Sequence, residues 1–314
     1  MHNRTRSLSL AIVALSAGTL GWGAVASAGG STPPGSSIPD GAGSTVTVVD
    51  AGDPATQIEL NTLPAVGDMA TIETHAVTEG GVILPDDDYD MSANVTSTET
   101  IEVTETTDSD FVATGSVVEY ESSSALTEGT ADLEDPMQAL VDVPLEYTFA
   151  NPYWVEDVEL GDDAPSGGDF ADLVDSLHQM HGFGAVALPD EPVGVGATWT
   201  ATVPWTYGDE TVPVAADFTL VSVADGAYEI SFRSELDSQD FVDTMTEGED
   251  MSEIESADGS FTATGTVHGD VAEPLRHAAA FELRMVYEAD YTDDDRDGGI
   301  DLTITAERES TPTT

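Results

Sequence analysis

The sequence predicts an all-β protein of mainly antiparallel strands, arranged as a curved sheet or half-barrel, or as a sandwich, with one or two short helices. The first observation is a series of short segments in which apolar and polar residues alternate, as at Tyr228, Ile230 and Phe232. Such alternation gives each strand one buried face and one wet face. Frequent turn signals between the segments and an abundance of threonine and valine point the same way.

The clearest single strand follows a turn rich in proline and glycine at 189–197. Its apolar residues share one parity and so point to one side: Trp199, Ala201, Val203, Trp205 and Tyr207. Pro204 has the opposite parity and cannot donate a ladder hydrogen bond. The segment is therefore predicted to be an edge strand or to carry a bulge.

One helix is predicted over 169–181. Asp169 is a suitable N-cap, and Gly182 follows as a stop signal. The apolar residues have helical spacing: Phe170, Leu173, Val174 and Leu177. A second, shorter helix is predicted over 136–141, with Pro136 at its first position. The segment 241–254 is compatible with a helix or a loop.

Two pairs of similar segments suggest an internal duplication. The run 66–71 resembles 195–200, and the run 111–117 resembles 261–267, in the same order along the chain. The alternative is chance similarity between strands rich in valine, threonine and glycine. A duplication would divide the β-rich domain, 45–310, into halves at about 45–165 and 166–310.

The N-terminus has the features of an export signal. Residues 1–28 combine a basic start, an apolar run from Leu8 to Val25 and an Ala-Ser-Ala cleavage site. Residues 29–44 have the composition of a flexible linker. We therefore expect a secreted, extracytoplasmic protein whose mature chain has no transmembrane segment. The alternative is a retained N-terminal anchor.

Composition excludes several classes of function. The chain has no cysteine, and 61 acidic residues face 7 basic ones, a formal net charge of −54. A surface this negative repels nucleic acids, so no nucleic-acid partner is expected. Because salt screens self-repulsion, we expect adaptation to saline surroundings or neutralisation by divalent cations. The alternative is a well-hydrated acidic surface without such adaptation.

Two clusters are candidate metal sites. The run 293–301 resembles the first part of a calcium-binding EF-hand loop, with candidate ligands Asp293, Asp295, Asp297 and Asp301. Ile304 stands where the bidentate glutamate belongs, so an acidic hairpin turn is the competing interpretation. His178 and His181 lie three residues apart on the predicted helix and could share a transition metal. Histidines near a helix C-terminus are also favoured by the helix dipole alone.

A concentration of aromatic residues is the candidate ligand site. The members singled out are Trp199, Trp205, Tyr207, Phe170 and Phe183. They predict either a plain core or an apolar cleft that the 169–181 helix covers. No nucleophile elbow, phosphate loop or dinucleotide motif is present, so no catalytic residue is predicted.

The run 188–199, Leu-Pro-Asp-Glu-Pro-Val-Gly-Val-Gly-Ala-Thr-Trp, resembles an uncharacterised family of exported, often actinobacterial, proteins and lipoproteins. The resemblance covers about a tenth of the chain. It implies an extracytoplasmic β-rich domain and supplies no catalytic residues. This chain lacks the lipid-bearing cysteine of the lipoprotein members. In layout alone, the chain is also similar to envelope lipid-carrier proteins with a half-barrel sheet.

These observations predict a secreted, acidic, non-enzymatic protein that binds an apolar or amphipathic ligand, such as a lipid, or serves in the cell envelope. The alternative is a calcium-stabilised surface or adhesion module. No cofactor other than calcium is suggested. The oligomeric state does not follow from the sequence.

Overall fold

The computed structural model describes residues 46–84, 87–126, 136–161, 164, 170, 173–174, 177–178, 181, 185–207, 210–236, 254–291 and 296–313. Strands make up 69% of it. They form one twelve-stranded sheet with the order β1-β7-β8-β9-β10-β11-β12-β2-β3-β4-β5-β6. Every pairing between these strands is antiparallel. The all-β prediction is confirmed, as a single sheet with two open edges.

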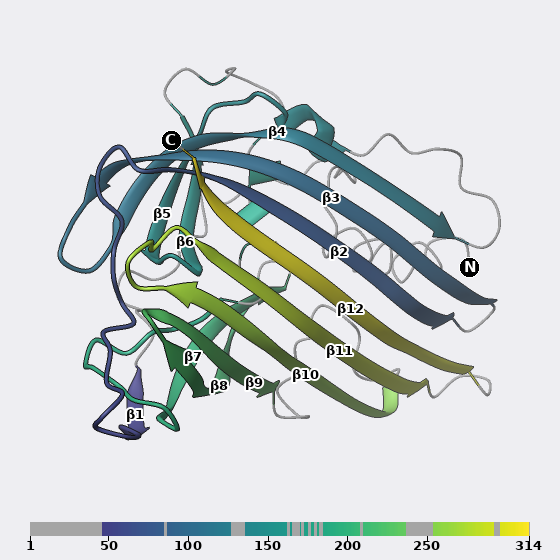
Figure 1. Cartoon of the computed structure of the whole chain (residues 1–314). Helices are drawn as coiled ribbons and strands as arrows, with labels where there is room; N and C mark the ends of the chain where they lie inside the picture. The colour runs from purple at the N-terminus through teal and green to yellow at the C-terminus, as the bar shows by residue number, and fades with distance from the viewer. Residues whose placement is uncertain are drawn as a thin grey trace.

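The strands differ greatly in length. Their bounds are β1 Thr47–Asp50, β2 Met69–Leu84, β3 Asp87–Thr106, β4 Phe111–Leu126, β5 Leu145–Asn151, β6 Trp154–Leu160, β7 Thr198–Tyr207, β8 Glu210–Ala224, β9 Ala227–Leu236, β10 Ile254–Asp270, β11 His277–Tyr291 and β12 Arg296–Thr313. Figure 1 shows the long strands β10, β11, β12, β2, β3 and β4 side by side, with the short β5 and β6 set at a steep angle to them. The C-terminal strand β12 lies between β11 and β2 and so joins the two ends of the sequence.

The two faces of the sheet differ in polarity, as the alternation predicts. We call the apolar side the inner face; on β12, for example, Leu302, Ile304 and Ala306 are buried there. The intervening Asp301, Thr305 and Glu307 are exposed on the outer face. Alternate residues therefore separate a dry side from an acidic wet side along the same strand.

The sheet curls, because residues from distant positions in its order meet on the inner face. The Tyr153 hydroxyl, at the turn between β5 and β6, lies 2.6 Å from the Tyr228 hydroxyl on β9. The Tyr153 ring also contacts the His277 ring on β11, with centroids 4.8 Å apart. The β5–β6 turn thus reaches across the inner face to the opposite half of the sheet.

The two halves repeat one local structure. In the first half, the Gly67 amide donates to the Val103 carbonyl, and the Val103 amide donates to the Asp68 carbonyl. The same two bonds are made in the second half by Gly196, Leu220 and Ala197. Gly67 and Gly196 also share a left-handed backbone, with φ of 90° and 84°. The similar runs 66–71 and 195–200 therefore occupy equivalent turns.

The second pair of similar runs does not occupy equivalent strands. β4 follows the β2–β3 hairpin, and β9 follows the corresponding β7–β8 hairpin. In register, Phe111 on β4 thus corresponds to Tyr228 on β9, whereas Phe261 lies one strand later, on β10. The likeness of 111–117 to 261–267 reflects a shared strand composition. By strand order, β2–β6 correspond to β7–β11, and the duplication itself stays a prediction.

The helix predictions hold at the described positions. The six described residues of the 169–181 segment are all helical: Phe170, Leu173, Val174, Leu177, His178 and His181. Leu173, Val174 and Leu177 pack into the core of the first half. The second prediction appears as a short 3-10 helix, η1, over Pro136–Leu140. Most of 241–254 lies outside the described residues; Ile254 begins β10.

The segment that contains Pro204 was predicted to be an edge strand or to carry a bulge. It belongs to β7, which pairs with β8 along its length. On the other side, β1 reaches only the start of β7, at Thr198–Thr200. No described strand lies beside Pro204 on that side, so its missing amide hydrogen breaks no ladder bond there.

Candidate ligand site on the inner face of the sheet

The inner face carries two apolar clusters of buried residues. The first is formed mainly by β2–β6 together with the 170–177 segment, and the second mainly by β7–β11 together with 185–197, with Tyr153 and Trp154 of the first half also in the second cluster. Phe281, on β11, packs against both. The clusters are therefore continuous across the middle of the sheet, as the curl requires.

The two described members of the predicted aromatic site, Trp199 and Phe170, pack in different clusters. Trp199 is fully buried in the second cluster, stacks on Phe218 and donates from Nε1 to the Ala187 carbonyl at 2.7 Å. Phe170 packs instead against the first cluster. Trp205 and Tyr207 are residues of β7 whose side chains are not described, and Phe183 lies outside the described residues. Around Trp199 the structure shows a filled core.

A polar network lies on the inner face, with three buried members and a part-buried arginine. It comprises Glu99 on β3, Tyr147 on β5, His181 and Arg308 on β12. The Tyr147 hydroxyl donates to Glu99 Oε2 at 2.9 Å, and His181 Nε2 lies 3.0 Å from the same oxygen. Arg308 Nη2 lies 2.5 Å from His181 Nδ1, and Arg308 Nε lies 3.5 Å from Thr74 Oγ1. The imidazole ring thus bridges a cation and an anion.

The partners assign the protonation states. Arg308 can only donate, so Nδ1 of His181 accepts, and Nε2 carries the hydrogen that Glu99 accepts. Burial lowers the pKa of His181 despite the attraction of Glu99, so the ring is neutral. Burial alone would raise the pKa of Glu99, but the attraction of His181 and Arg308 and the hydrogen bonds of His181 and Tyr147 hold it below its usual value. The network is therefore an ion pair with a neutral histidine between its charges.

The repeat provides an internal comparison for this network. Glu99 pairs with Ile72 on β2, and the equivalent pair in the second half is Ala216 with Ala201. By the same register, Tyr147 corresponds to Val267. Ala216 and Val267 are both buried. The architecture can therefore be built with apolar residues at these positions, so the fold itself does not require the polar ones.

Further polar atoms are buried on the inner face without a hydrogen-bond partner. Among the described side chains these include Ser97 Oγ, Thr78 Oγ1 and His277 Nδ1. An unpaired buried polar group costs about 1–3 kcal/mol. Ser97 lies beside Thr74 in the register, and Thr74 lies beside Arg308. Ser97 thus lies close to the network, whereas Thr78 is opposite Ile304, farther along β12.

Beyond the network, the inner face becomes apolar again. Leu283 and Met285 on β11 pair with Ile304 and Leu302 on β12. All four are buried, yet none belongs to either cluster formed by the described residues. We call these four residues the apolar stripe. The inner face therefore has a polar centre with an apolar surface leading away from it.

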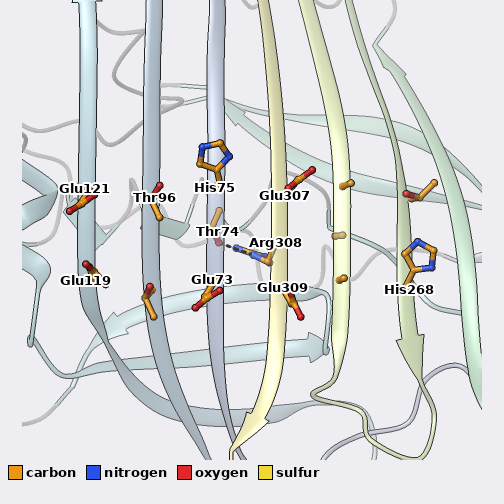
Figure 2. Close-up of a pocket in the computed structure, with 15 residues that line it drawn as sticks. Glu73, Thr74, His75, Thr96, Glu119, Glu121, His268, Glu307, Arg308 and Glu309 are labelled. Carbon is orange, nitrogen blue, oxygen red and sulfur yellow. Dashed lines mark hydrogen bonds between the residues drawn. The ribbon is translucent and has the colours of Figure 1, made fainter.

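The outer face contains a shallow groove of about 520 Å³. Figure 2 shows its walls, where Glu73 and His75 on β2 lie beside Glu309 and Glu307 on β12. Glu73 and Glu309 are directly opposite, which is unfavourable for two like charges. In a chain with 61 acidic residues, glutamates around a groove are not specific evidence for a ligand. They do mark a place where salt should reduce repulsion.

The candidate metal ligands are not brought together within the described residues. Asp293 and Asp295 lie outside them, and the side chain of Asp297, on β12, is not described. Asp301 is exposed on the outer face and forms an ion pair with Arg284 at 3.2 Å. Among described side chains, no three histidine or acidic residues form a group that could hold a metal ion. Calcium binding at the 293–301 turn stays a prediction.

His181 is unsuited to the zinc site considered for His178 and His181. Its two ring nitrogens are occupied, Nε2 by Glu99 and Nδ1 by Arg308. A metal would have to displace one of these buried partners. His178 and His181 share one side of the segment by helical spacing. At His181 that side faces the polar network.

The sequence patterns considered above did not single out Glu99 and Arg308, although the strand parity of each residue marks it as a candidate. Glu99 has the same strand parity as Ile101 and Val103, and Arg308 has that of Ile304 and Ala306. A charged residue on the apolar parity of a strand is a candidate for a buried polar site.

No described helix has the length and apolar character that crossing a bilayer requires.

Comparisons with known proteins give only distant likenesses. No family model and no curated protein sequence matches the chain, so the resemblance to an exported family stays a prediction. A solved structure titled "Lipid-protein interactions in lipovitellin" matches with a TM-score of 0.45 and 8% identity, over 80% of this chain and 25% of that one. A solved structure titled "Crystal Structure of Pseudomonas aeruginosa OccK7 (OpdD)" matches with a TM-score of 0.29 and 8% identity, over 79% of this chain and 100% of that one. At such TM-scores these likenesses carry no functional information.

Proposed function

We propose that this is an exported, non-enzymatic protein that binds an amphipathic ligand on the inner face of its sheet. The observation that carries the proposal is the combination of a polar network with an apolar stripe on one continuous face. An amphipathic molecule has a polar end and an apolar chain, and it needs a polar surface for the one beside an apolar surface for the other. The equivalent positions of the second half, Ala216 and Val267, show that the polar centre is not an architectural necessity.

The site has the character of a binding surface rather than a catalytic one. Glu99 Oε2 already accepts from Tyr147 and His181, and both ring nitrogens of His181 are occupied within the network. What the inner face offers is apolar contact area and a few polar groups that fix orientation, which is the usual composition of a ligand site.

A pair of substitutions on one strand tests this proposal. Met285 is buried on the inner face of β11, while its neighbour Val286 belongs to the outer face. Each can be made polar with almost no change of volume, as Met285→Gln and Val286→Thr. We expect Met285→Gln to weaken binding of a long-chain alcohol about tenfold, because an amide would replace an apolar contact. Val286→Thr should leave the affinity unchanged.

The measurement is equilibrium titration of each folded variant with oleyl alcohol in concentrated NaCl. Circular dichroism and a urea melt would confirm that both variants retain the sheet. Equal effects of the two substitutions would show that the inner face is not the binding surface. Absence of binding to the unmodified protein would refute the proposal for long apolar chains altogether.

A further inference from the structure

Arg308 is used differently from the other arginines whose side chains are described. Arg233, Arg276 and Arg284 are exposed and each forms an ion pair with a nearby carboxylate. Arg308 lies on the inner-face parity of β12, between the buried residues Ala306 and Ser310. The whole chain has only 7 basic residues. Placing one of these charges on the apolar face costs free energy unless the charge is paired or hydrogen-bonded there.

The hydrogen bonds of Arg308 leave part of its guanidinium available. Among the described residues its partners engage Nε and Nη2, through Thr74 and His181. The second terminal nitrogen, Nη1, has no such partner. His181 separates Arg308 from Glu99, so the two charges are not in direct contact. A planar guanidinium whose Nη1 has no partner among the described residues suits a carboxylate or a phosphate.

A second donor lies in the same row of the sheet. Arg308 is directly opposite Thr74, which is directly opposite Ser97. The Ser97 hydroxyl is buried, with the residue 1% exposed, and has no hydrogen-bond partner. It lies on the inner face, as Arg308 does. An anion held by Arg308 would supply the acceptor that Ser97 lacks.

The row also lies at a suitable distance from the apolar stripe. Along β12, the inner-face residues after Arg308 toward the stripe are Ala306, Ile304 and Leu302. At about 3.4 Å per residue, Leu302 lies about 20 Å from Arg308. Small side chains, Ala306 and Ala76, occupy the row next to Arg308. The surface thus runs from a cation, across small residues, to large apolar ones.

We infer that the row Arg308, Thr74 and Ser97 binds the anionic headgroup of a long-chain amphipathic ligand, with the apolar chain along the stripe. This inference rests on the proposed function and names the class of ligand. The headgroup chemistry is that of a carboxylate or a phosphate. Arg308 supplies the charge, and Ser97 supplies the hydrogen bond that distinguishes a bound headgroup from an apolar end.

The test compares three ligands that share one eighteen-carbon, singly unsaturated chain and differ in headgroup: oleate, oleyl phosphate and oleyl alcohol. Each is titrated below its aggregation concentration into the full-length mature protein in concentrated NaCl. We expect at least one anion to bind about tenfold more tightly than the alcohol, because hydrogen bonds to charged groups are the stronger ones. Whichever anion binds more tightly identifies the headgroup as carboxylate or phosphate.

Ser97→Ala is the matched variant. Removing an unpaired hydroxyl should leave the urea midpoint unchanged or slightly higher, so the variant remains folded. We expect it to reduce the affinity for the preferred anion about fivefold and to leave the affinity for oleyl alcohol unchanged. An equal affinity for anions and alcohol, or an unchanged anion affinity in Ser97→Ala, would overturn the inference alone. Failure of all three ligands to bind would overturn the proposed function as well.

Discussion

Arg308→Met should lower the free energy of unfolding by about 3–5 kcal/mol, which is the usual cost of removing one partner of a buried ion pair. Met retains most of the apolar stem, so the loss comes from the charge and its hydrogen bonds. Glu99 would remain buried without its cation, and His181 Nδ1 would lose its donor. Urea unfolding at constant salt measures the difference.

Two further variants distinguish the effect of losing the Arg308 charge from the effect of a general disturbance of the sheet. Arg284→Met removes an exposed ion pair with Asp301 on the outer face and should cost less than about 1 kcal/mol. The double variant Glu99→Ala with Arg308→Met introduces at position 99 the residue found at the equivalent Ala216. It should be more stable than Arg308→Met alone, because no charge stays unpaired. A cost for Arg308→Met no larger than that for Arg284→Met would contradict the assignment.

Acid should destabilise the protein strongly through His277. Burial, reinforced by the charge of Arg308, lowers the pKa of His277 from 6.5 to about 3. Its folded state therefore binds fewer protons than the unfolded chain between these values. The stabilisation that neutral His277 contributes is fully present above pH 6.5 and is lost as the pH falls toward 3. At about 1.4 kcal/mol per pH unit, the loss approaches about 5 kcal/mol.

His277→Phe isolates this effect. The phenyl ring can retain the contact with the Tyr153 ring, but it cannot bind a proton. The difference in unfolding free energy between the variant and the unmodified protein should therefore change by several kcal/mol between pH 6.5 and 4, in favour of the variant at lower pH. His268→Phe, at an exposed position on the adjacent strand β10, is the control. Parallel pH profiles for His277→Phe and the unmodified protein would contradict the prediction.

The same acid range should also affect the polar network. The pKa of His181 is lowered by burial, so its contribution is lost as the pH falls below 6.5. The pKa of Glu99 is held below 4.5, so its contribution is lost at still lower pH. His178 and Arg308 add positive charge near His181, while Glu99 opposes them. Both losses have the same sign as that of His277.

The fold was largely predictable, because alternation on each strand is a local property. Buried positions such as Tyr228, Ile230 and Leu302 follow from parity alone. The turns before β2 and β7 were recognisable as a pair because left-handed glycines, Gly67 and Gly196, preserve a local sequence. Helical spacing likewise identified the buried side of the 169–181 segment.

The site was not predictable in the same way, because its contacts join distant parts of the chain. His181 meets Glu99 and Arg308 across 82 and 127 residues. These contacts depend on β12 lying between β11 and β2, and no local pattern specifies that position. The aromatic concentration around Trp199 was compatible with a core or a cleft, and the structure shows Trp199 stacked on Phe218. A buried charge on an apolar parity was the more informative signal.

The central claim is that the inner face holds an amphipathic ligand, and native mass spectrometry of the protein tests it most directly. The protein would be purified in concentrated salt from cells that produce it and exchanged gently into a volatile buffer. We expect a second species heavier than the polypeptide by the mass of one long-chain amphipathic molecule, which organic solvent removes. A single species with the mass of the polypeptide alone, unchanged after incubation with oleate or oleyl phosphate, would contradict the claim.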